Sequence, residues 1–409
     1  MAKKRNIKMG LSFACLLVAL VTTQESYAQP LTPTEQLGKL IFFDESLSIN
    51  ANQSCAACHG PDVGWTGPAE IINAHGAVYE GSVPGRFGNR KPPSSAYATL
   101  SPIFFFLEKQ GLFIGGNFWD GRATGERLGN PAADQAQGPF LNPVEQALAT
   151  PADVVTQICT ENYGILFREI WGASACDLGN EDVAYDYVAL SIAAYEASSE
   201  VNAFTSKFDA FKKGKAKLTK QEKTGRSLFN GKAKCSRCHP ASGNAPLFTD
   251  FTYDNLGMPR NPENSFYTQT DFNPDGYDWI DLGLGGFLAT RGEFADKAAE
   301  NEGKHRVPTL RNVDKRPSLN FVKAYGHNGY FKSLEGIVHF YNTRDVKPVC
   351  IDKFTTEQQA LAQNCWPEPE VAVNVNTTEL GNLGLTEEDE DAIVAFMKTL
   401  NDGFVVQLP

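Results

Sequence analysis

The sequence has no excess of basic residues, and this absence restricts its possible partners. Lys and Arg together number 37 and Asp and Glu 48, so the formal net charge is −11 over 409 residues. An acidic surface repels both nucleic-acid phosphates and anionic lipids. We therefore expect no nucleic-acid partner, whereas a basic redox protein would fit this charge.

Long apolar runs are absent after the first 28 residues, so no later segment is expected to span a membrane. Within those residues, a basic start precedes an apolar run at 9–22 and a small-residue cleavage site at 26–28. This order predicts a secretory signal peptide over residues 1–28 and a periplasmic protein. A membrane anchor is the weaker alternative, because a bilayer span needs ~20 apolar residues. Removing the signal peptide would change the net charge to about −14.

Cysteine is scarce and falls in pairs. Of nine cysteines, Cys15 lies in the signal peptide, and four belong to two Cys-x-x-Cys-His motifs. The other four form two close pairs, Cys159 with Cys176 and Cys350 with Cys365. Even numbers in an exported chain indicate disulfides. We favour these two local pairings, although the sequence alone leaves the connectivity open.

The Cys-x-x-Cys-His motif is the attachment signature of c-type haem. Its residues are Cys55, Cys58 and His59, then Cys235, Cys238 and His239. The thiols add to the haem vinyl groups, and the histidine reaches the iron. A zinc site is the alternative, but neither motif has a second Cys or His pair nearby to complete four ligands. Two motifs in one exported chain therefore predict two covalently bound haem c groups.

The sequence around the first motif is repeated around the second. Residues 37–43 (LGKLIFF) precede the first motif, and residues 224–229 (TGRSLF) precede the second. A duplication explains this similarity more simply than chance. The sequence predicts a mainly α chain with two cytochrome c-like helical domains, residues 29–210 and 211–409, each with one haem.

Other segments support a mainly helical chain with little sheet. Residues 181–199 are rich in apolar side chains and predict a helix, and a Thr-x-x-Asp capping box at Thr386 begins another. Gly, Pro and Asn are frequent at 81–93 and 255–273, which predicts loops. The basic run at 212–223 is interpreted as a linker, with helix resuming near its centre.

Further motifs occur in order between and after the haem motifs. They are NFWDGRA (117–123), QAQGP (135–139), NPVE (142–145), VPTLRNV (307–313), HNG (327–329) and SLE (333–335). In this combination the sequence resembles bacterial di-haem cytochrome c peroxidases and the related MauG-type di-haem enzymes. The resemblance extends over about residues 33–402.

The resemblance implies roles for three residues between the haem motifs. Glu145 matches the catalytic glutamate of the peroxide pocket, Gln135 the pocket glutamine, and Trp119 the tryptophan between the two haems. A positioned carboxylate can carry a proton between the two peroxide oxygens. Without the surrounding motifs, a surface acid, a solvated glutamine and a core tryptophan would be simpler interpretations. The spacer between Trp119 and Gln135 is longer here than in the family.

The resemblance also implies axial ligands. His59 and His239 are the proximal ligands. His75 has the spacing of a loop histidine that ligates the first iron in resting peroxidases, with an exposed loop histidine as an equal alternative. Tyr341 stands where peroxidases carry a ligating methionine and MauG-type enzymes a tyrosine. A buried, non-ligating tyrosine is the alternative, with Met258 or another histidine as ligand.

The family binds one calcium ion, but this sequence departs from the calcium pattern. Lys91 stands where the family has a ligating asparagine, and an ammonium group only donates hydrogen bonds. Carbonyl groups of Val322 and Ala324 remain available as ligands. Calcium is therefore a doubtful cofactor.

Three functions are consistent with the sequence. The first is a cytochrome c peroxidase that reduces hydrogen peroxide with electrons from a small cytochrome or copper protein. The second is a MauG-type oxidase that acts on protein residues through a high-valent state shared by both haems. The third is a non-catalytic di-haem electron carrier, which Glu145 and Gln135 disfavour.

Overall fold

The computed structural model describes residues 30–406, and all but the first belong to one compact unit. The predicted signal peptide, residues 1–28, lies outside this range. Among the described residues, no helix combines the length and apolarity that crossing a bilayer requires.

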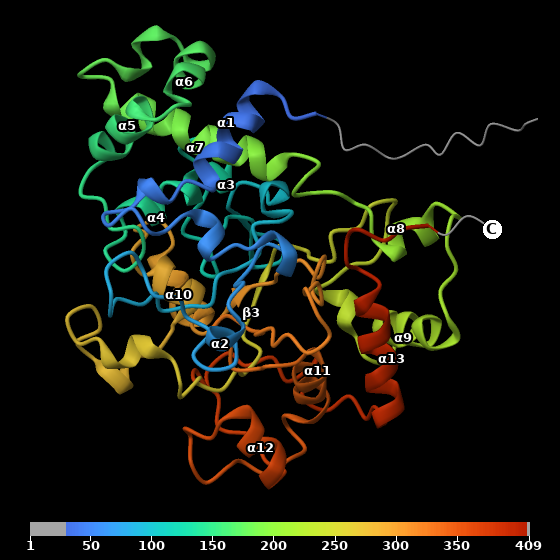
Figure 1. Cartoon of the computed structure of the whole chain (residues 1–409). Coiled ribbons are helices and arrows are strands. Elements are labelled where there is room, and N and C mark those ends of the chain that lie inside the picture. Colours follow the sequence, from blue (N-terminus) through green and yellow to red (C-terminus); the bar gives the residue numbers. More distant parts are fainter. Residues whose placement is uncertain (1–29, 407–409) are drawn as a thin grey trace, which may run out of the picture. The chain divides into compact units, whose positions relative to one another are not determined.

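Most regular structure is helical, which confirms the mainly α prediction (Figure 1). The α-helices are α1 (Pro33–Phe42), α2 (Glu70–Asn73), α3 (Pro131–Ala136), α4 (Gly138–Leu141), α5 (Pro151–Thr160), α6 (Gly164–Trp171), α7 (Glu181–Ala197), α8 (Lys207–Lys212), α9 (Lys220–Asn230), α10 (Gly283–Leu288), α11 (Leu334–Thr343), α12 (Glu357–Gln363) and α13 (Glu387–Lys398). Two short antiparallel pairs join β1 (Phe105–Leu107) to β2 (Leu112–Ile114) and β3 (Tyr253–Asp254) to β4 (His305–Arg306).

Local sequence signals place the main helices where they were expected. Thr386 caps α13 by accepting a hydrogen bond from the Asp389 N–H, and Thr219 caps α9 in the same way through Glu222. Each of these side chains satisfies an amide that has no partner within its helix. The linker is shorter than predicted, because α8 ends at Lys212 and α9 begins eight residues later. Residues 81–93 form a loop as expected, whereas 255–273 include a 3₁₀ turn, η7 (Ser265–Thr268).

The repeated sequence segments form the same helix crossing twice (Figure 1). Helix α1, before the first haem motif, packs on α7, and α9, before the second, packs on α13. A glycine stands at each crossing. A Cβ atom at Gly38 would lie 1.8 Å from the Ser191 carbonyl oxygen, and one at Gly225 would lie 1.7 Å from that of Ala392. Only glycine lets the two backbones approach this closely, which explains why both repeats carry it.

The apolar side chains form separate cores for the two parts of the chain. One cluster takes its fully buried members from Leu37 to Val201, and the other from Phe208 to Leu400. The core therefore changes close to the predicted domain boundary after residue 210. A third, smaller cluster joins the two parts, and its buried members are Phe104, Phe113, Tyr253, Leu284 and Leu288.

Both predicted disulfides are confirmed. Cys159 bonds to Cys176 with a Cα–Cα distance of 5.9 Å, and Cys350 bonds to Cys365 with a distance of 5.1 Å. Each closes a loop within one part of the chain, so the four motif cysteines keep free thiols.

The glycine crossing leads to a stability prediction. Gly225→Ala introduces a methyl group against the Ala392 carbonyl, and we expect the free energy of unfolding to fall by about 1–3 kcal/mol, the usual cost of overpacking. Denaturant unfolding measures the change. Gly292→Ala is the matched control, because a Cβ there meets no atom within 4 Å. Equal stability of the two variants would contradict the close crossing.

Candidate functional site

Both Cys-x-x-Cys-His motifs begin with one turn of 3₁₀ helix. These turns are η2 (Cys55–Ala57) and η6 (Cys235–Arg237). In the first, the His59 N–H donates to the Cys55 carbonyl at 2.9 Å, and in the second the His239 N–H donates to the Cys235 carbonyl, also at 2.9 Å. The two motifs therefore share one backbone geometry.

Each motif histidine is oriented by a backbone carbonyl. The Nδ1 atom of His59 lies 3.3 Å from the Trp65 oxygen, and that of His239 lies 2.8 Å from the Phe248 oxygen. A carbonyl only accepts, so Nδ1 carries the hydrogen and Nε2 keeps its lone pair. Burial lowers the pKa of His59 to about 4 and also lowers the pKa of His239. Both rings are thus held in the neutral form that binds metal.

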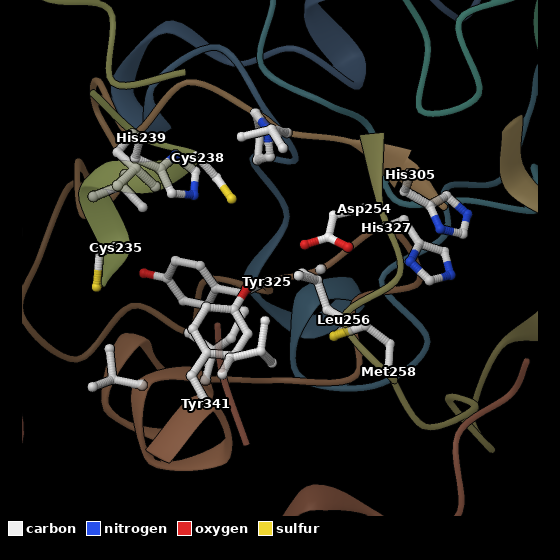
Figure 2. Close-up of a pocket in the computed structure, with 18 of the residues that line it drawn as sticks. Cys235, Cys238, His239, Asp254, Leu256, Met258, His305, Tyr325, His327 and Tyr341 are labelled. Carbon is white, nitrogen blue, oxygen red and sulfur yellow. The ribbon is translucent and has the colours of Figure 1, made fainter. Parts of the chain in front are cut away.

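A large cavity lies beside the second motif (Figure 2). Water-sized molecules can reach about 220 Å³ of it. Cys235, Cys238 and His239 line one side of the cavity, and Tyr341 and Met258 also face it. The cavity therefore joins the haem motif to both of its candidate sixth ligands.

Helix α11 brings Tyr341 to the second motif. Burial is the main reason why the pKa of its phenol is raised above the usual range, and nearby thiols and Asp254 add to the effect. Without a cation in the cavity, the hydroxyl therefore stays protonated. A ferric ion would supply the charge that a phenolate needs.

Glu145 lies beside the first motif. It follows α4 and is half-buried, and the Asn142 amide donates to its Oε2 atom at 3.0 Å. Burial raises the pKa of its carboxyl group. Its closeness to the motif follows from its neighbour Gln146, whose side-chain amide donates to the Gln53 carbonyl at 3.2 Å, two residues before Cys55. Burial raises the pKa of the Cys58 thiol, and the Glu145 charge adds to this effect. A carboxyl group of raised pKa is suited to proton transfer near neutral pH.

Gln135 and Trp119 are the other two residues to which the resemblance assigns a role. Gln135 is half-buried on α3, and no hydrogen bond of its side chain is present among the described residues. Trp119 is buried, and its indole N–H donates to the Lys91 carbonyl at 2.8 Å. Trp119 also lines the cavity of the second motif. Its place between the two haems stays a prediction.

His75 lies at the surface. Its side chain is 60% exposed, and its Nδ1 atom pairs with Glu263 at 2.9 Å. Its role as a ligand of the first iron stays a prediction.

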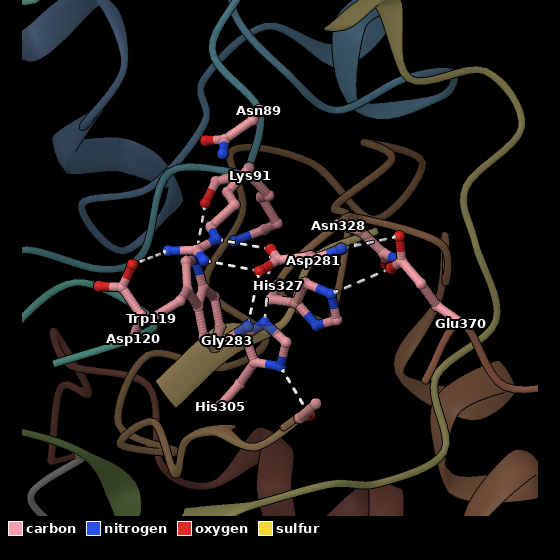
Figure 3. Close-up of polar contacts among 12 residues, drawn as sticks. Asn89, Lys91, Trp119, Asp120, Asp281, Gly283, His305, His327, Asn328 and Glu370 are labelled. Carbon is pink, nitrogen blue, oxygen red and sulfur yellow. Dashed lines mark hydrogen bonds and ion pairs between the residues drawn. The ribbon is translucent and has the colours of Figure 1, made fainter. Parts of the chain in front are cut away.

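Asp281, His305 and His327 form a buried cluster (Figure 3). The two imidazole rings stack with centroids 3.5 Å apart at an angle of 7°, so their in-plane lone pairs run parallel and do not converge on one ion. Arg90 holds both oxygens of Asp281 at 2.6 Å. The cluster is therefore a polar network, and its His327 ring packs edge-on against Trp119 at 6.4 Å.

Comparison with known proteins identifies the family. The family described as di-haem cytochrome c peroxidase matches residues 32–217. Over the whole chain, the methylamine utilization protein MauG of Paracoccus denitrificans is 34% identical across 408 residues, which is 96% of each chain. The chain belongs to the di-haem cytochrome c peroxidase and MauG family.

Other family members match over most of their length. Cytochrome c551 peroxidase of Pseudomonas aeruginosa is 30% identical over 317 residues, covering 77% of this chain and 73% of that protein. The crystal structure of the di-haem peroxidase BthA of Burkholderia thailandensis superposes with a TM-score of 0.72 at 29% identity, covering 91% of this chain and 87% of that one. The chain is therefore similar to both MauG and peroxidase members.

The second motif fits one of the family's haem groups. Paired thiols, an imidazole with a free Nε2 and an adjoining cavity are what a c-type haem needs at Cys235, Cys238 and His239. The family's calcium fits less well. Lys91 is buried at the position of the asparagine ligand, and the Val322 carbonyl accepts a hydrogen bond from Asn73 at 3.3 Å.

Two buried groups near the motifs were not predicted from the sequence. Glu196 on α7 lies beside Cys55, and burial raises its pKa to about 8. The sequence signal for it was an acidic residue among the apolar residues of a predicted helix. Arg306 lines the cavity of the second motif and is 8% exposed. Its burial depends on long-range packing, which the sequence does not reveal.

The poor fit to calcium leads to a prediction. Because Lys91 cannot ligate a cation, we expect EGTA to leave the optical spectra of both haems unchanged. Spectra recorded before and after chelation and gel filtration test this. A spectral change that added calcium reverses, and added magnesium does not, would contradict it.

Proposed function

We propose that this chain is a periplasmic di-haem peroxidase, which reduces hydrogen peroxide with electrons from a small redox protein. Residues 29–210 and 211–409 would each form a cytochrome c-like domain with one covalently attached haem. The observation that carries the proposal is Glu145, a half-buried carboxyl group of raised pKa beside the first of two matching haem motifs. A plain electron carrier has no use for such a group.

The two haems, when bound, supply the iron at which peroxide is cleaved and the route by which electrons arrive. Glu145 accepts a proton from one oxygen of hydrogen peroxide and returns it to the other, which leaves as water. Asn142 holds Oε2, so Oε1 is free for this transfer. Two electrons and two further protons complete the conversion of one peroxide into two waters.

Gln135 and Trp119 act beside this step. Gln135 would orient the peroxide through an amide that does not titrate. Trp119 lies between the two motifs and offers a polarisable path for electrons from the second haem to the first. The net negative charge suits a basic donor, such as a small cytochrome or copper protein.

The first functional prediction concerns Glu145. Glu145→Gln keeps the shape but removes the proton acceptor, so we expect peroxide turnover with reduced cytochrome c to fall about 10²–10⁴-fold with haem content unchanged. The raised pKa also places the acid limb of the wild-type pH–rate profile above the range of an ordinary glutamate, because only the ionised form accepts the proton.

Steady-state assays across pH test both expectations. Glu108→Gln, at an exposed position, is the matched control. Turnover of Glu145→Gln at the control rate would remove Glu145 from the mechanism. Absence of peroxide turnover in the wild-type protein would remove the peroxidase function.

A second function is favoured by one observation. Tyr341, and not a methionine, faces the second motif from α11. An anionic oxygen ligand lowers an iron potential relative to a thioether. MauG-type enzymes have a tyrosine at this position, so oxidation of residues in a partner protein is the alternative activity.

Tyr341→Phe tests the ligand. We expect the spectrum of one haem to change and its potential to rise, because the iron loses an anionic oxygen, while the other haem is unchanged. Redox titration followed optically separates the two haems. Tyr277→Phe, at an exposed position, is the control. A wild-type spectrum in Tyr341→Phe would make the tyrosine a packing residue.

A further inference from the structure

Two buried cations face the cavity of the second motif without a counter-ion. Lys91 is 7% exposed and Arg306 is 8% exposed, and both line the cavity. Among the described residues, no carboxylate forms an ion pair with either of them. Two carboxylates that line the cavity pair with other buried arginines, Asp281 with Arg90 and Glu370 with Arg260 at 3.5 Å. Asp254 also lines the cavity, and its carboxylate accepts a hydrogen bond from the Asn376 amide at 2.7 Å.

Trp119 forms hydrogen bonds with the backbone of both residues, and Figure 3 shows the one with Lys91. Its indole N–H donates to the Lys91 carbonyl at 2.8 Å, and its own carbonyl accepts the Arg306 N–H at 2.8 Å. The Lys91 N–H donates to the His327 carbonyl, also at 2.8 Å. Trp119 therefore links the backbone at Lys91 to the backbone at Arg306, although these residues come from different parts of the chain.

Neither cation uses all its donors. The Lys91 ammonium donates to the Thr66 hydroxyl at 2.9 Å and to the Pro92 carbonyl at 3.0 Å, which leaves one N–H over. The Arg306 guanidinium makes no hydrogen bond to the described residues. An uncompensated buried charge costs several kcal/mol. Burial lowers the pKa of Lys91 to about 8 and lowers that of Arg306, which is consistent with this cost.

Lys323 is a buried cation whose hydrogen-bond donors are all satisfied by backbone carbonyls. Its ammonium donates to the carbonyls of Val63, Asn312 and Lys315 at 2.8, 2.8 and 3.1 Å. All three donors are satisfied, so Lys323 joins three backbone segments and needs no anion. Lys91 and Arg306 differ from it because both line the cavity and neither has all its donors satisfied by the described residues.

We propose that Lys91 and Arg306 bind the propionate carboxylates of the haem attached at Cys235 and Cys238. This inference rests on the proposed haem function. A c-type haem is attached through its vinyl edge, and its two propionates stand on the opposite edge of the macrocycle. Figure 2 shows the cysteines on one side of the cavity and His327, the neighbour of Lys91, on the other. Two carboxylates then neutralise two cations.

The redox potential of the second haem tests the assignment. Lys91→Met and Arg306→Gln each remove a positive charge beside a propionate, and we expect both to lower the potential of that haem and leave the other unchanged, because the ferric state is favoured. Lys91→Arg keeps the charge and should keep the wild-type potential. Lys353→Gln, at an exposed position, is the charge-matched control. Potentials of both charge-removing variants equal to that of the control would overturn the proposal.

A crystal structure of the wild-type holoprotein gives a check that needs no variant. A propionate oxygen within about 3.2 Å of the Lys91 ammonium or the Arg306 guanidinium supports the proposal. Propionates that point to solvent, with water or a small anion bound to the two cations, overturn it. If a variant loses its haem, the wild-type crystal structure still decides between these outcomes. Haem content is measured first, because it separates a failure of the proposed function from a failure of the propionate assignment. Absence of haem at Cys235 and Cys238 refutes the proposed function itself.

Discussion

The orientation of two imidazole rings governs the chemistry of this molecule. His59 and His239 each give their Nδ1 hydrogen to a backbone carbonyl and keep a lone pair on Nε2. Those carbonyls are fixed by the loops that follow each motif, and the motifs are fixed by helices that cross at Gly38 and Gly225. A shift in either crossing would move the imidazole ring of the motif that follows it, so the close backbone packing helps to set where each Nε2 atom lies.

The two motifs share one backbone geometry but differ in the residues around them. Near the first motif lies Glu145, a half-buried carboxyl group of raised pKa, which we propose as the proton acceptor. Near the second, Tyr341 faces the cavity, and Lys91 and Arg306 supply positive charge. A proton acceptor suits a site where peroxide is cleaved, whereas charge and an oxygen ligand set a potential. Trp119 connects the two environments through its contacts.

Structural features that depend on a few neighbouring residues could be predicted from the sequence. Capping boxes fixed the starts of α9 and α13, and paired cysteines in an exported chain indicated both disulfides. Groups whose role depends on partners far along the chain were not readable. Arg306 is buried only because β4 pairs with β3 and meets Trp119, and the ion pair of His75 with Glu263 joins two loops of no recognisable pattern.

The proposed function requires that both motifs carry haem, and the intact mass of the denatured, purified protein tests this directly. Covalent attachment survives denaturation, whereas a loosely bound cofactor is lost. We predict the mass of the mature chain plus two haem groups, with both disulfides formed. A mass equal to the chain alone, or to the chain with a single haem, would contradict the reading of Cys55, Cys58, Cys235 and Cys238 as paired attachment sites.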